Sequence, residues 1–341
     1  MDKPLFSIVV GVFNIEKYLQ RCLDSIDKQV KNFEVIIIDD GSTDKSGDIC
    51  DKWAMNKEYV RVYHQQNQGI SKVRNNGVQY SKGEYILFID PDDWVEDSYT
   101  KTLEQLVEKN GGSEQVDIIG LNFKIVTDSY RGLKDGNSDN SYPESAVSGE
   151  RALEWLLDSQ VGTYACQYAI KKNLYLKNNI QFPDMILYED AATIYRLMYF
   201  AKKVICTNKP LYNYFQRQNS FSHTPTVPRT TEYFKLFEQM DAFFTTQNRQ
   251  DLFERSKGYK LPRLFSAYLN VIRLDISAKE KQKYNKKITK LIRENAILWP
   301  TNISTLVKEI LFFTHLFKPI SYIHDWIEKK NDKTKYYNFN R

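Results

Sequence analysis

Apolar runs alternate with amphipathic segments from residue 6 to residue 89, and this order constrains the fold more than any other feature. The runs lie at Phe6–Val12, Phe33–Asp39, Val60–His64 and Glu84–Ile89, and the amphipathic segments at Glu16–Gln29, Ser42–Asn56 and Ser71–Ser81. The second run contains Ile36-Ile37-Ile38, which is apolar on both faces of a strand. Such strands are typical of parallel sheets that helices cover on both sides. The sequence therefore predicts an α/β fold with a right-handed, doubly wound sheet.

The rest of the chain divides into a mixed stretch and a helical one. We expect helices at Ser98–Lys109, Gly149–Gln160, Lys171–Asn178 and Glu189–Ala201, and strands at Val116–Val126, Val204–Thr207 and Leu211–Phe215. Thr127–Ser148 is polar and aperiodic, which predicts a loop, and loops of this length are often lids. Beyond Pro228 the pattern predicts only helices, at Thr230–Thr246, Leu252–Ser277, Lys279–Leu298, Ile303–Leu316 and Ile320–Lys329. We therefore expect an α/β domain over residues 1–228 and a mostly helical C-terminal region over residues 229–341.

Asp90, Asp92 and Asp93 come directly after the apolar run Tyr85–Ile89. Pro91 cannot donate a ladder hydrogen bond, so the strand should end there. In open α/β sheets, ligands bind at the carboxyl ends of the strands. Carboxylates this close repel one another unless a cation neutralises them, and a divalent cation that carries a diphosphate is suited to oxygen ligands. The alternative is a solvated turn, because Asp and Pro are common turn residues.

The ends of the first two strands bring polar side chains to the same edge. Asp40 follows the second strand, where an acidic group is placed to hydrogen-bond a ribose hydroxyl or a base N–H. The alternative for Asp40 is a helix-capping turn to Ser42. Asn14 and Glu16 follow the first strand, and they either face the same crevice or cap the next helix.

A further polar segment, Asn67–Asn75, leads into the third helix. Gly69 permits a close approach of the backbone to a ligand. Arg74 lies one turn into the helix on the crevice side, where its planar fork suits phosphate or holds carboxylates in place. The alternative is a solvated Arg on a helix surface.

Together these segments resemble the family 2 glycosyltransferases, which adopt the GT-A fold. The blocks that carry the resemblance are Ser7–Asn14, Ile37–Asp44, Gly69–Asn75 and Phe88–Trp94, and all of them match the family in order and spacing. No G-x-x-x-x-G-K loop is present, which argues against a nucleotide hydrolase. The resemblance implies a GT-A catalytic domain over residues 1–228. Its nucleotide-sugar half would span about residues 1–125 and its acceptor half about residues 126–228.

The resemblance also implies a donor site. Its nucleotide-sugar contacts would be Val12, Phe13, Asn14, Glu16, Asp40, Gly69, Arg74, Asp90 and Asp92. In such enzymes Asp40 would contact uracil or ribose, Asp90 would contact the donor's ribose or sugar, and Asp92 would ligate Mn²⁺ or Mg²⁺ on the diphosphate. The chemistry is independently sound, because breaking a sugar–phosphate bond puts charge on the diphosphate and a metal stabilises that leaving group.

The acceptor side is implied by a later block. Glu189-Asp190 opens a helix and by itself indicates only a capping arrangement. Inverting members carry a similar pair whose Asp deprotonates the acceptor hydroxyl, so the resemblance implies Asp190 as the base with Glu189 beside it. One departure concerns Cys166, Gln167 and Tyr168, which stand where relatives often have Trp-x-Lys. That segment is expected to touch the acceptor.

A third block, Tyr214–Ser220, resembles the Tyr-x-x-Arg-x-x-Ser segment that closes over the diphosphate in many relatives. The resemblance implies that Arg217 and Ser220 contact phosphate oxygens. His223 is either a further metal or phosphate ligand or a solvated loop histidine.

Cysteine usage and hydropathy bear on the compartment. The cysteines Cys22, Cys50, Cys166 and Cys206 are scattered, which favours reduced thiols in a cytoplasmic protein, and neither they nor the histidines show zinc-ligand spacing. The first residues do not resemble a signal peptide. No apolar run approaches the ~20 residues that a membrane span needs.

The C-terminal region is basic. Residues 251–341 contain 19 Lys and Arg against 9 Asp and Glu, and the rest of the chain is slightly acidic. Apolar residues recur at helical spacing within Ile303–Ile327. Such a region lies on the anionic inner face of a membrane, or it packs as a helical subdomain or a homo-oligomer interface. No nucleic-acid-binding module accompanies the charge, so we expect no nucleic-acid partner.

The leading interpretation is an inverting, metal-dependent hexosyl- or N-acetylhexosaminyltransferase. Its donor would be a nucleotide-sugar, with a UDP-sugar as the best match. Its acceptor would be a glycan, glycolipid or glycoprotein hydroxyl in capsule, exopolysaccharide or other cell-surface glycan synthesis. A sugar-1-phosphate nucleotidyltransferase would need a Gly-rich, Arg- and Lys-containing loop where Val12–Glu16 stands. A non-catalytic sugar-nucleotide-binding protein is disfavoured by the joint presence of Asp90, Asp92 and Asp190.

Overall fold

The computed structural model describes residues 3–30, 32–127, 136–137, 146–216, 226–296, 307–308 and 311–312. The chain divides into two compact units. Unit 1 comprises Met1–Leu156 and Gln160–Thr224, and unit 2 comprises Leu157–Ser159 and Pro225–Arg341. Within the described part of the chain, no helix is both long enough and apolar enough to cross a membrane.

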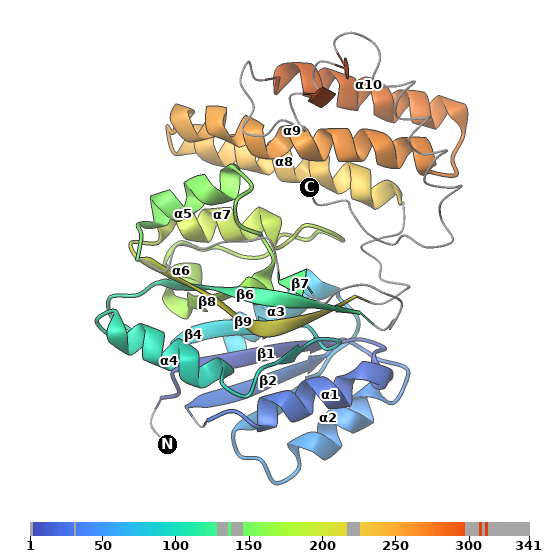
Figure 1. Cartoon of the computed structure of the whole chain (residues 1–341). Coiled ribbons are helices and arrows are strands. Elements are labelled where there is room, and N and C mark those ends of the chain that lie inside the picture. The colour runs from blue at the N-terminus through green and yellow to red at the C-terminus, as the bar shows by residue number, and fades with distance from the viewer. Residues whose placement is uncertain are drawn as a thin grey trace. The chain divides into compact units, whose positions relative to one another are not determined.

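Unit 1 is built on one mixed sheet (Figure 1). Its strands are β1 (Phe6–Val12), β2 (Phe33–Asp39), β3 (Val60–His64), β4 (Tyr85–Ile89), β5 (Trp94–Val95), β6 (Ile118–Thr127), β7 (Gly136–Asn137), β8 (Tyr168–Lys171) and β9 (Val204–Gln216). They pair in the order β3-β2-β1-β4-β8-β6-β9-β5, and β7 pairs with β6. The first four strands of this order are parallel, as the doubly wound pattern predicts. Strand β8 is antiparallel to both of its neighbours.

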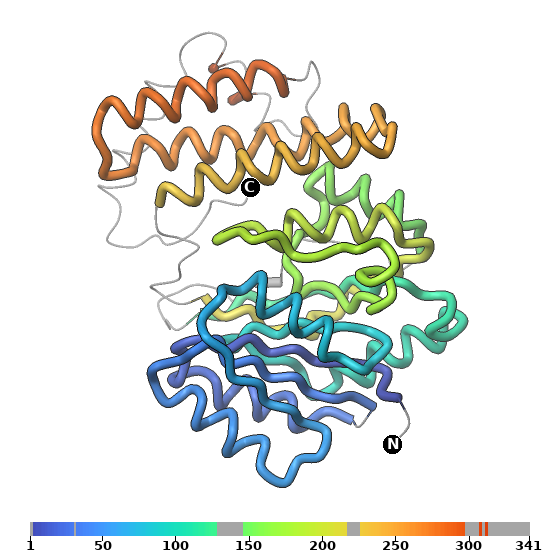
Figure 2. The backbone as a smooth tube through the Cα atoms, turned by 180° about the vertical axis from the view of Figure 1, so that it is seen from behind, coloured from blue at the N-terminus to red at the C-terminus, as the bar shows by residue number. Residues whose placement is uncertain are grey.

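Helices cover both faces of the parallel strands. In unit 1 they are α1 (Glu16–Asp27), α2 (Ser46–Ala54), α3 (Ile70–Tyr80), α4 (Tyr99–Lys109), α5 (Gly149–Leu157), a 3₁₀ turn η1 (Ala165–Gln167), α6 (Lys172–Lys177) and α7 (Ala191–Phe200). Ile8 and Val10 of β1 join the core cluster that contains Leu19 of α1. Val9 points the other way, and a Cβ built on Gly77 of α3 would come within 2.4 Å of it. Helices α1 and α2 therefore lie on the near face in Figure 1, and α3 on the near face in the reverse view of Figure 2.

The strand register brings the predicted site segments to one edge. Val12 is opposite Asp39, and Val10 is opposite Ile89. Because these strands are parallel, the residues that follow Val12, Asp39 and Ile89 leave the sheet on the same side. The expectation that Phe13, Asp40 and Asp90 share one edge is thus confirmed in unit 1.

The antiparallel part of the sheet differs from the prediction. The two short strands expected at 204–207 and 211–215 are one strand, β9, which pairs along β6 with irregularities at Asn122. Strands β5 and β8 were not predicted. Both are too short to show periodicity, and each is defined by its partners, since Trp94 pairs with Asn213 and Tyr85 with Lys171.

Unit 2 contains α8 (Val227–Thr246), α9 (Gln250–Arg273) and α10 (Ala278–Glu294). The helices predicted at 230–246, 252–277 and 279–298 are confirmed with small shifts of their ends, and those at 303–316 and 320–329 lie largely outside the described residues. Helix α10 buries Ile288 and Ile292. Helix α9 buries Lys260, which pairs with Asp241 of α8.

Candidate active site

Strand β4 ends in a tight turn that separates its carboxylates. The Asp93 amide donates to the Asp90 carbonyl at 3.0 Å, which closes the turn. Asp90 and Asp92 are half-buried, whereas Asp93 is 1% exposed and points into the core. There Asp93 accepts hydrogen bonds from the Tyr212 hydroxyl at 2.6 Å and the Phe215 amide at 2.7 Å. The three carboxylates are close together as predicted, but only Asp90 and Asp92 remain at the sheet edge.

Asp93 is the structural member of this group. Burial, and then the nearby Asp90 and Asp92, raise the pKa of the Asp93 carboxyl well above its ordinary value. Tyr212 ties the turn to β9, because its hydroxyl also accepts from the Asp90 amide at 3.1 Å. Sequence reasoning missed this role of Tyr212, since a tyrosine in an apolar strand gives the same pattern as any core aromatic residue.

The residues at the turn fit a divalent metal that is bound largely by substrate. No cluster of three or more His, Cys, Asp or Glu side chains with metal-binding placement occurs among the described residues. Magnesium in particular is usually held by one or two carboxylates together with phosphate oxygens and water. Asp90 and Asp92 supply oxygen donors of that kind. His223, the other predicted metal ligand, lies outside the described residues, as do Arg217 and Ser220.

Arg74 links the Asp90 turn to the Glu189-Asp190 pair. It is 7% exposed, and its guanidinium forms an ion pair with Glu189 and lies 3.5 Å from an Asp90 oxygen. Burial lowers the pKa of Arg74, but Glu189 and then Asp90 more than offset that effect and raise it. The helix position therefore places a permanent cation between carboxylates. A solvated Arg74 is excluded.

Asp190 begins α7, and its carboxylate accepts from the Ala191 amide at 2.6 Å. Burial and the adjacent Glu189 raise the pKa of Asp190 to about 7, although Arg74 acts in the opposite direction. A carboxyl with such a pKa is matched to proton abstraction near neutral pH. Asp190 can therefore cap α7 and still have a pKa suited to a general base.

The residue before this pair has an unusual backbone. Tyr188 has a φ of 66°, in the left-handed region that large side chains rarely adopt. Its carbonyl accepts from the Ala192 amide at 2.9 Å. Backbone strain of this kind often lies at functional sites. The left-handed conformation of Tyr188 turns the chain sharply just before Glu189 and Asp190.

Asp40 holds the loop before α3. Its carboxylate accepts from the Gln65 side chain at 2.6 Å, the Gln68 amide at 2.9 Å and the Gly69 amide at 2.8 Å. Two carboxylate oxygens offer about four acceptor sites, of which these bonds occupy three, and Asp40 is 3% exposed. Gly69 has a φ of 83°, and nothing lies within 4 Å of the position a Cβ would take. The glycine is therefore required by the backbone turn and leaves open space beside it.

The loops after β1 and β2 are joined by reciprocal hydrogen bonds. The Asn14 amide donates to Ser42 Oγ at 3.1 Å, and Asn14 Oδ1 accepts from the Thr43 amide at 2.8 Å. Glu16 repeats the pattern, because its amide donates to Asp44 at 3.1 Å and its carboxylate accepts from the Lys45 amide at 2.9 Å. Asn14 and Glu16 thus bind the neighbouring loop and do not cap their own helix, whose N-cap Ile15 has no side-chain capping bond.

Phe13 is the exposed aromatic residue of this edge. Its side chain is 49% exposed, whereas the preceding Val12 is 1% exposed. The Val12 carbonyl accepts from the Asp40 amide at 2.8 Å. The strand ends therefore hold Phe13 beside the Asp40 loop, where an aromatic ring suits stacking against a planar base.

The segment expected to touch the acceptor is buried. Cys166, Gln167 and Tyr168 are at most 5% exposed and form η1 and the start of β8. The Tyr168 hydroxyl donates to the Gly162 carbonyl at 2.6 Å. Tyr164 is 40% exposed and stacks near Tyr214, with ring centroids 6.2 Å apart. The expectation was wrong for the three named side chains, because η1 and β8 both lie against β4 and β6 and bury them.

The comparisons with known proteins agree with this geometry. A family model described as glycosyl transferase family 2 matches residues 7–155. The glycosyltransferase GlyG of Streptococcus pneumoniae serotype 4 is 34% identical over 232 residues, which is 64% of this chain and 73% of that protein.

Solved structures share the fold. S. aureus TarS 1-349 in complex with UDP-GlcNAc has a TM-score of 0.68 and 22% identity, over 98% of this chain and 93% of that chain. The mannosyltransferase PcManGT from Pyrobaculum calidifontis in complex with GDP-Man and Mn2+ has a TM-score of 0.52 and 14% identity, over 90% of this chain and 87% of that chain. At these identities the likeness shows the GT-A-like fold alone.

Proposed function

This chain belongs to glycosyltransferase family 2, and we propose that it is an inverting, metal-dependent hexosyl- or N-acetylhexosaminyltransferase with a UDP-sugar donor. The acceptor would be a hydroxyl of a glycan, a lipid-linked sugar or a protein-linked sugar. The observation that carries this proposal is the continuous set Asp90–Arg74–Glu189–Asp190, in which one buried arginine joins a metal-competent turn to a carboxyl of pKa about 7.

We assign the donor site to the sheet edge within residues 1–125. Phe13 would stack on the uracil, Asp40 would accept from its N–H, and Gly69 leaves room for the ribose. Asp90 would contact the donor's ribose or sugar. Arg217 and Ser220 would contact the diphosphate. The acceptor half would be residues 126–228.

Asp92, with Asp90 beside it, would hold Mn²⁺ or Mg²⁺. When bound, the metal would stabilise the negative charge of the departing diphosphate. Asp190 would accept the proton of the acceptor hydroxyl while that oxygen forms a bond to the anomeric carbon. The bond from that carbon to the diphosphate oxygen breaks, and UDP leaves from the opposite face, so the configuration inverts. Glu189 would hold Arg74, and Arg74 would in turn keep the Asp90 carboxylate in place.

The metal role is tested with UDP. We expect calorimetry to show UDP binding that requires Mn²⁺ or Mg²⁺, and Asp92→Asn to remove this dependence and most activity while leaving thermal unfolding unchanged. Equal UDP binding in excess EDTA, together with full activity of Asp92→Asn, would exclude the role. Uridine binding serves as the control, because it needs neither the metal nor the diphosphate.

The base is tested by transfer. Asp190→Asn should slow transfer to the acceptor by roughly 10²–10⁴-fold, the usual range for a general base, with donor affinity nearly unchanged. A panel of UDP-sugars assayed for UDP release identifies the donor. Release of pyrophosphate from a sugar 1-phosphate and UTP would instead indicate a nucleotidyltransferase. Transfer at the wild-type rate in Asp190→Asn would move the base elsewhere.

We further propose that α10 places the enzyme on an anionic membrane surface. Five of its exposed cations lie at helical spacing, opposite the buried Ile288 and Ile292. They are Lys279, Lys283, Lys286, Lys290 and Arg293. Lys290 also pairs with Glu294 at 3.6 Å. Basic residues near an anionic bilayer each contribute about 1 kcal/mol. The competing proposal is a homo-oligomer formed through apolar residues of the C-terminal region.

Vesicle flotation with anionic lipid separates these proposals. Membrane attachment should weaken as salt rises, because the Debye length falls from ~10 Å at 0.1 M to ~3 Å at 1 M. The triple variant Lys283→Glu, Lys286→Glu, Lys290→Glu should not float, whereas Lys17→Glu in unit 1 should. Light scattering reports the oligomer. A protein that neither floats nor exceeds 40.2 kDa would refute both proposals.

A further inference from the structure

Helix α1 lies along the segment that carries the Asp90–Asp93 turn. From this helix, Arg21 Nη2 donates to the Asp92 carbonyl at 2.8 Å, and Ser25 Oγ accepts from the Val95 amide at 3.1 Å. Just past the helix end, Gln29 Nε2 donates to the Glu96 carbonyl at 3.0 Å. These three residues are spaced four apart, so their side chains form one row that runs along α1 and continues just past its end. These bonds hold backbone atoms of Asp92, Val95 and Glu96, and they do not use the side chains of those residues.

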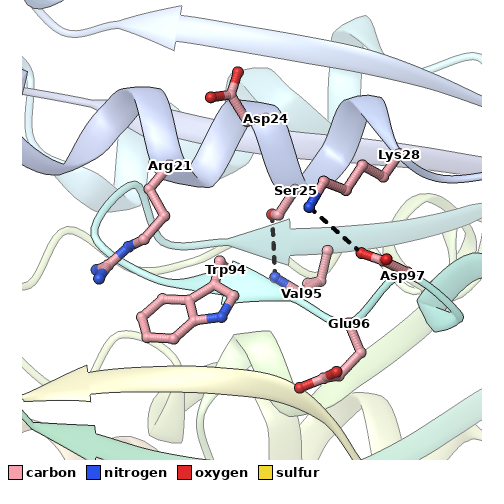
Figure 3. Close-up of a pocket in the computed structure, with 8 residues that line it drawn as sticks. All are labelled: Arg21, Asp24, Ser25, Lys28, Trp94, Val95, Glu96 and Asp97. Carbon is pink, nitrogen blue, oxygen red and sulfur yellow. Dashed lines mark hydrogen bonds and ion pairs between the residues drawn. The ribbon is translucent and has the colours of Figure 1, made fainter.

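Arg21 is the member of this row nearest the proposed metal ligand. Its guanidinium carbon lies 3.9 Å from the centroid of the Trp94 ring and 4.4 Å from that of Phe215. Figure 3 shows Arg21 extended over the Trp94 indole, in a groove of about 520 Å³ between α1 and residues 94–97. Two aromatic rings and a carbonyl thus define the position of a long side chain that would otherwise sample many rotamers.

The same rings connect the turn to β9. Phe215 is 6% exposed, and its amide donates to Asp93. From the neighbouring position of α1, the Cys22 thiol approaches the Asp90 carbonyl at 3.6 Å. The turn is therefore held by its backbone, from α1 on one side and from β9 on the other. A movement of Arg21 would therefore shift the Asp92 backbone directly, through the hydrogen bond to its carbonyl.

We propose that Arg21 is a positioning residue that holds the Asp92 backbone, and through it the Asp92 carboxylate, where the donor's metal–diphosphate binds. This inference rests on the metal role proposed for Asp92. It assigns Arg21 no contact with substrate. Its effect should therefore be seen in metal-dependent binding of the diphosphate and not in binding of the base.

Calorimetry with UDP and Mn²⁺, and separately with uridine in EDTA, tests the proposal. Arg21→Ala should weaken Mn²⁺-dependent UDP affinity about tenfold, equivalent to about 1.4 kcal/mol, and leave uridine affinity unchanged. Arg21→Lys should recover only part of the loss, because an ammonium lacks the planar fork. Lys28→Ala is the matched control, since Lys28 lines the same groove and pairs only loosely with Asp97, at 3.8 Å (Figure 3). It should bind like the wild type.

A double variant separates positioning from general damage. If Arg21 acts through Asp92, then Arg21→Ala should cost nothing further in an Asp92→Asn background. Additive losses, or equal losses of UDP and uridine affinity, would overturn the proposal. The proposal would also be overturned if UDP binding needs metal and Arg21→Ala has the same Mn²⁺-dependent UDP affinity as the wild type. A wild type that binds UDP equally with and without metal would instead overturn the Asp92 role, and the Arg21 proposal with it.

Discussion

Replacing Asp190 by Asn should make the protein more stable at neutral and alkaline pH. The substitution is nearly isosteric, and Asn caps a helix about as well as Asp, so the hydrogen bond from the Ala191 amide is retained. What the variant loses is the charge of a carboxyl that the fold desolvates. Because burial raises the pKa of Asp190 from its ordinary 3.8 to about 7, ionising it in the folded state opposes folding.

The size and pH window of the effect follow from the shift. Unfolded chains release this proton near pH 4 and folded ones near pH 7, so the wild type loses stability as pH rises through this window. At 1.36 kcal/mol per unit the shift corresponds to about 4 kcal/mol. Solvent at the partly exposed side chain screens the charge, and we expect about 2 kcal/mol. For a unit of this size that is about 4–8 °C in Tm.

Thermal unfolding of the wild type and of Asp190→Asn at pH 5 and pH 8 measures this difference. The variant should unfold at a higher temperature at pH 8, and the gap should be smaller at pH 5. Other titrating groups are common to both proteins, so they cancel in the comparison. A gap that does not change with pH, or a variant that is less stable at pH 8, would refute the desolvation argument.

Three further predictions concern the scaffold of the site. Arg74→Met should lower the free energy of unfolding by about 3–5 kcal/mol in urea titrations, because it leaves Glu189 as a buried, unpaired charge. Tyr212→Phe should cost about 1–3 kcal/mol in the same assay, since buried Asp93 loses a donor. Gly69→Ala should cost about 1–3 kcal/mol from backbone strain alone, and its Tm should fall without loss of cooperativity.

The sequence predicts the parallel half of the sheet well because its information is local. Strands β1, β2 and β4 are apolar enough to be found by composition, and β3 is found by its strand-forming Val60, Val62 and Tyr63. Parallel order then fixes the shared edge. The antiparallel half depends on pairing between distant segments. Trp94 and Val95 form a strand only because Asn213 and Tyr212 lie beside them. No periodicity within two residues can contain that information.

The site shows the same division. The Asp-Pro-Asp turn, Asp40 and the Glu189-Asp190 pair are visible as motifs, and the structure places Asp90, Arg74 and Glu189 together. Which of three chemically identical carboxylates turns inward is decided by a hydroxyl 119 residues away, on Tyr212. The sequence gives no local signal for that choice.

The reciprocal hydrogen bonds between the loops after β1 and β2 should make them one cooperative opening unit. The Asn14 amide is held by a residue 28 positions away, and the Thr43 amide by one 29 positions away. Native-state hydrogen exchange at these amides should therefore report a single opening free energy. Suppose that one loop alone were replaced by that of a relative, to change the nucleotide that is recognised. The new loop would lack the hydrogen-bond partners that the other loop supplies. With the donor site proposed for this edge, an exchange of base preference between family members should require both loops to be moved together.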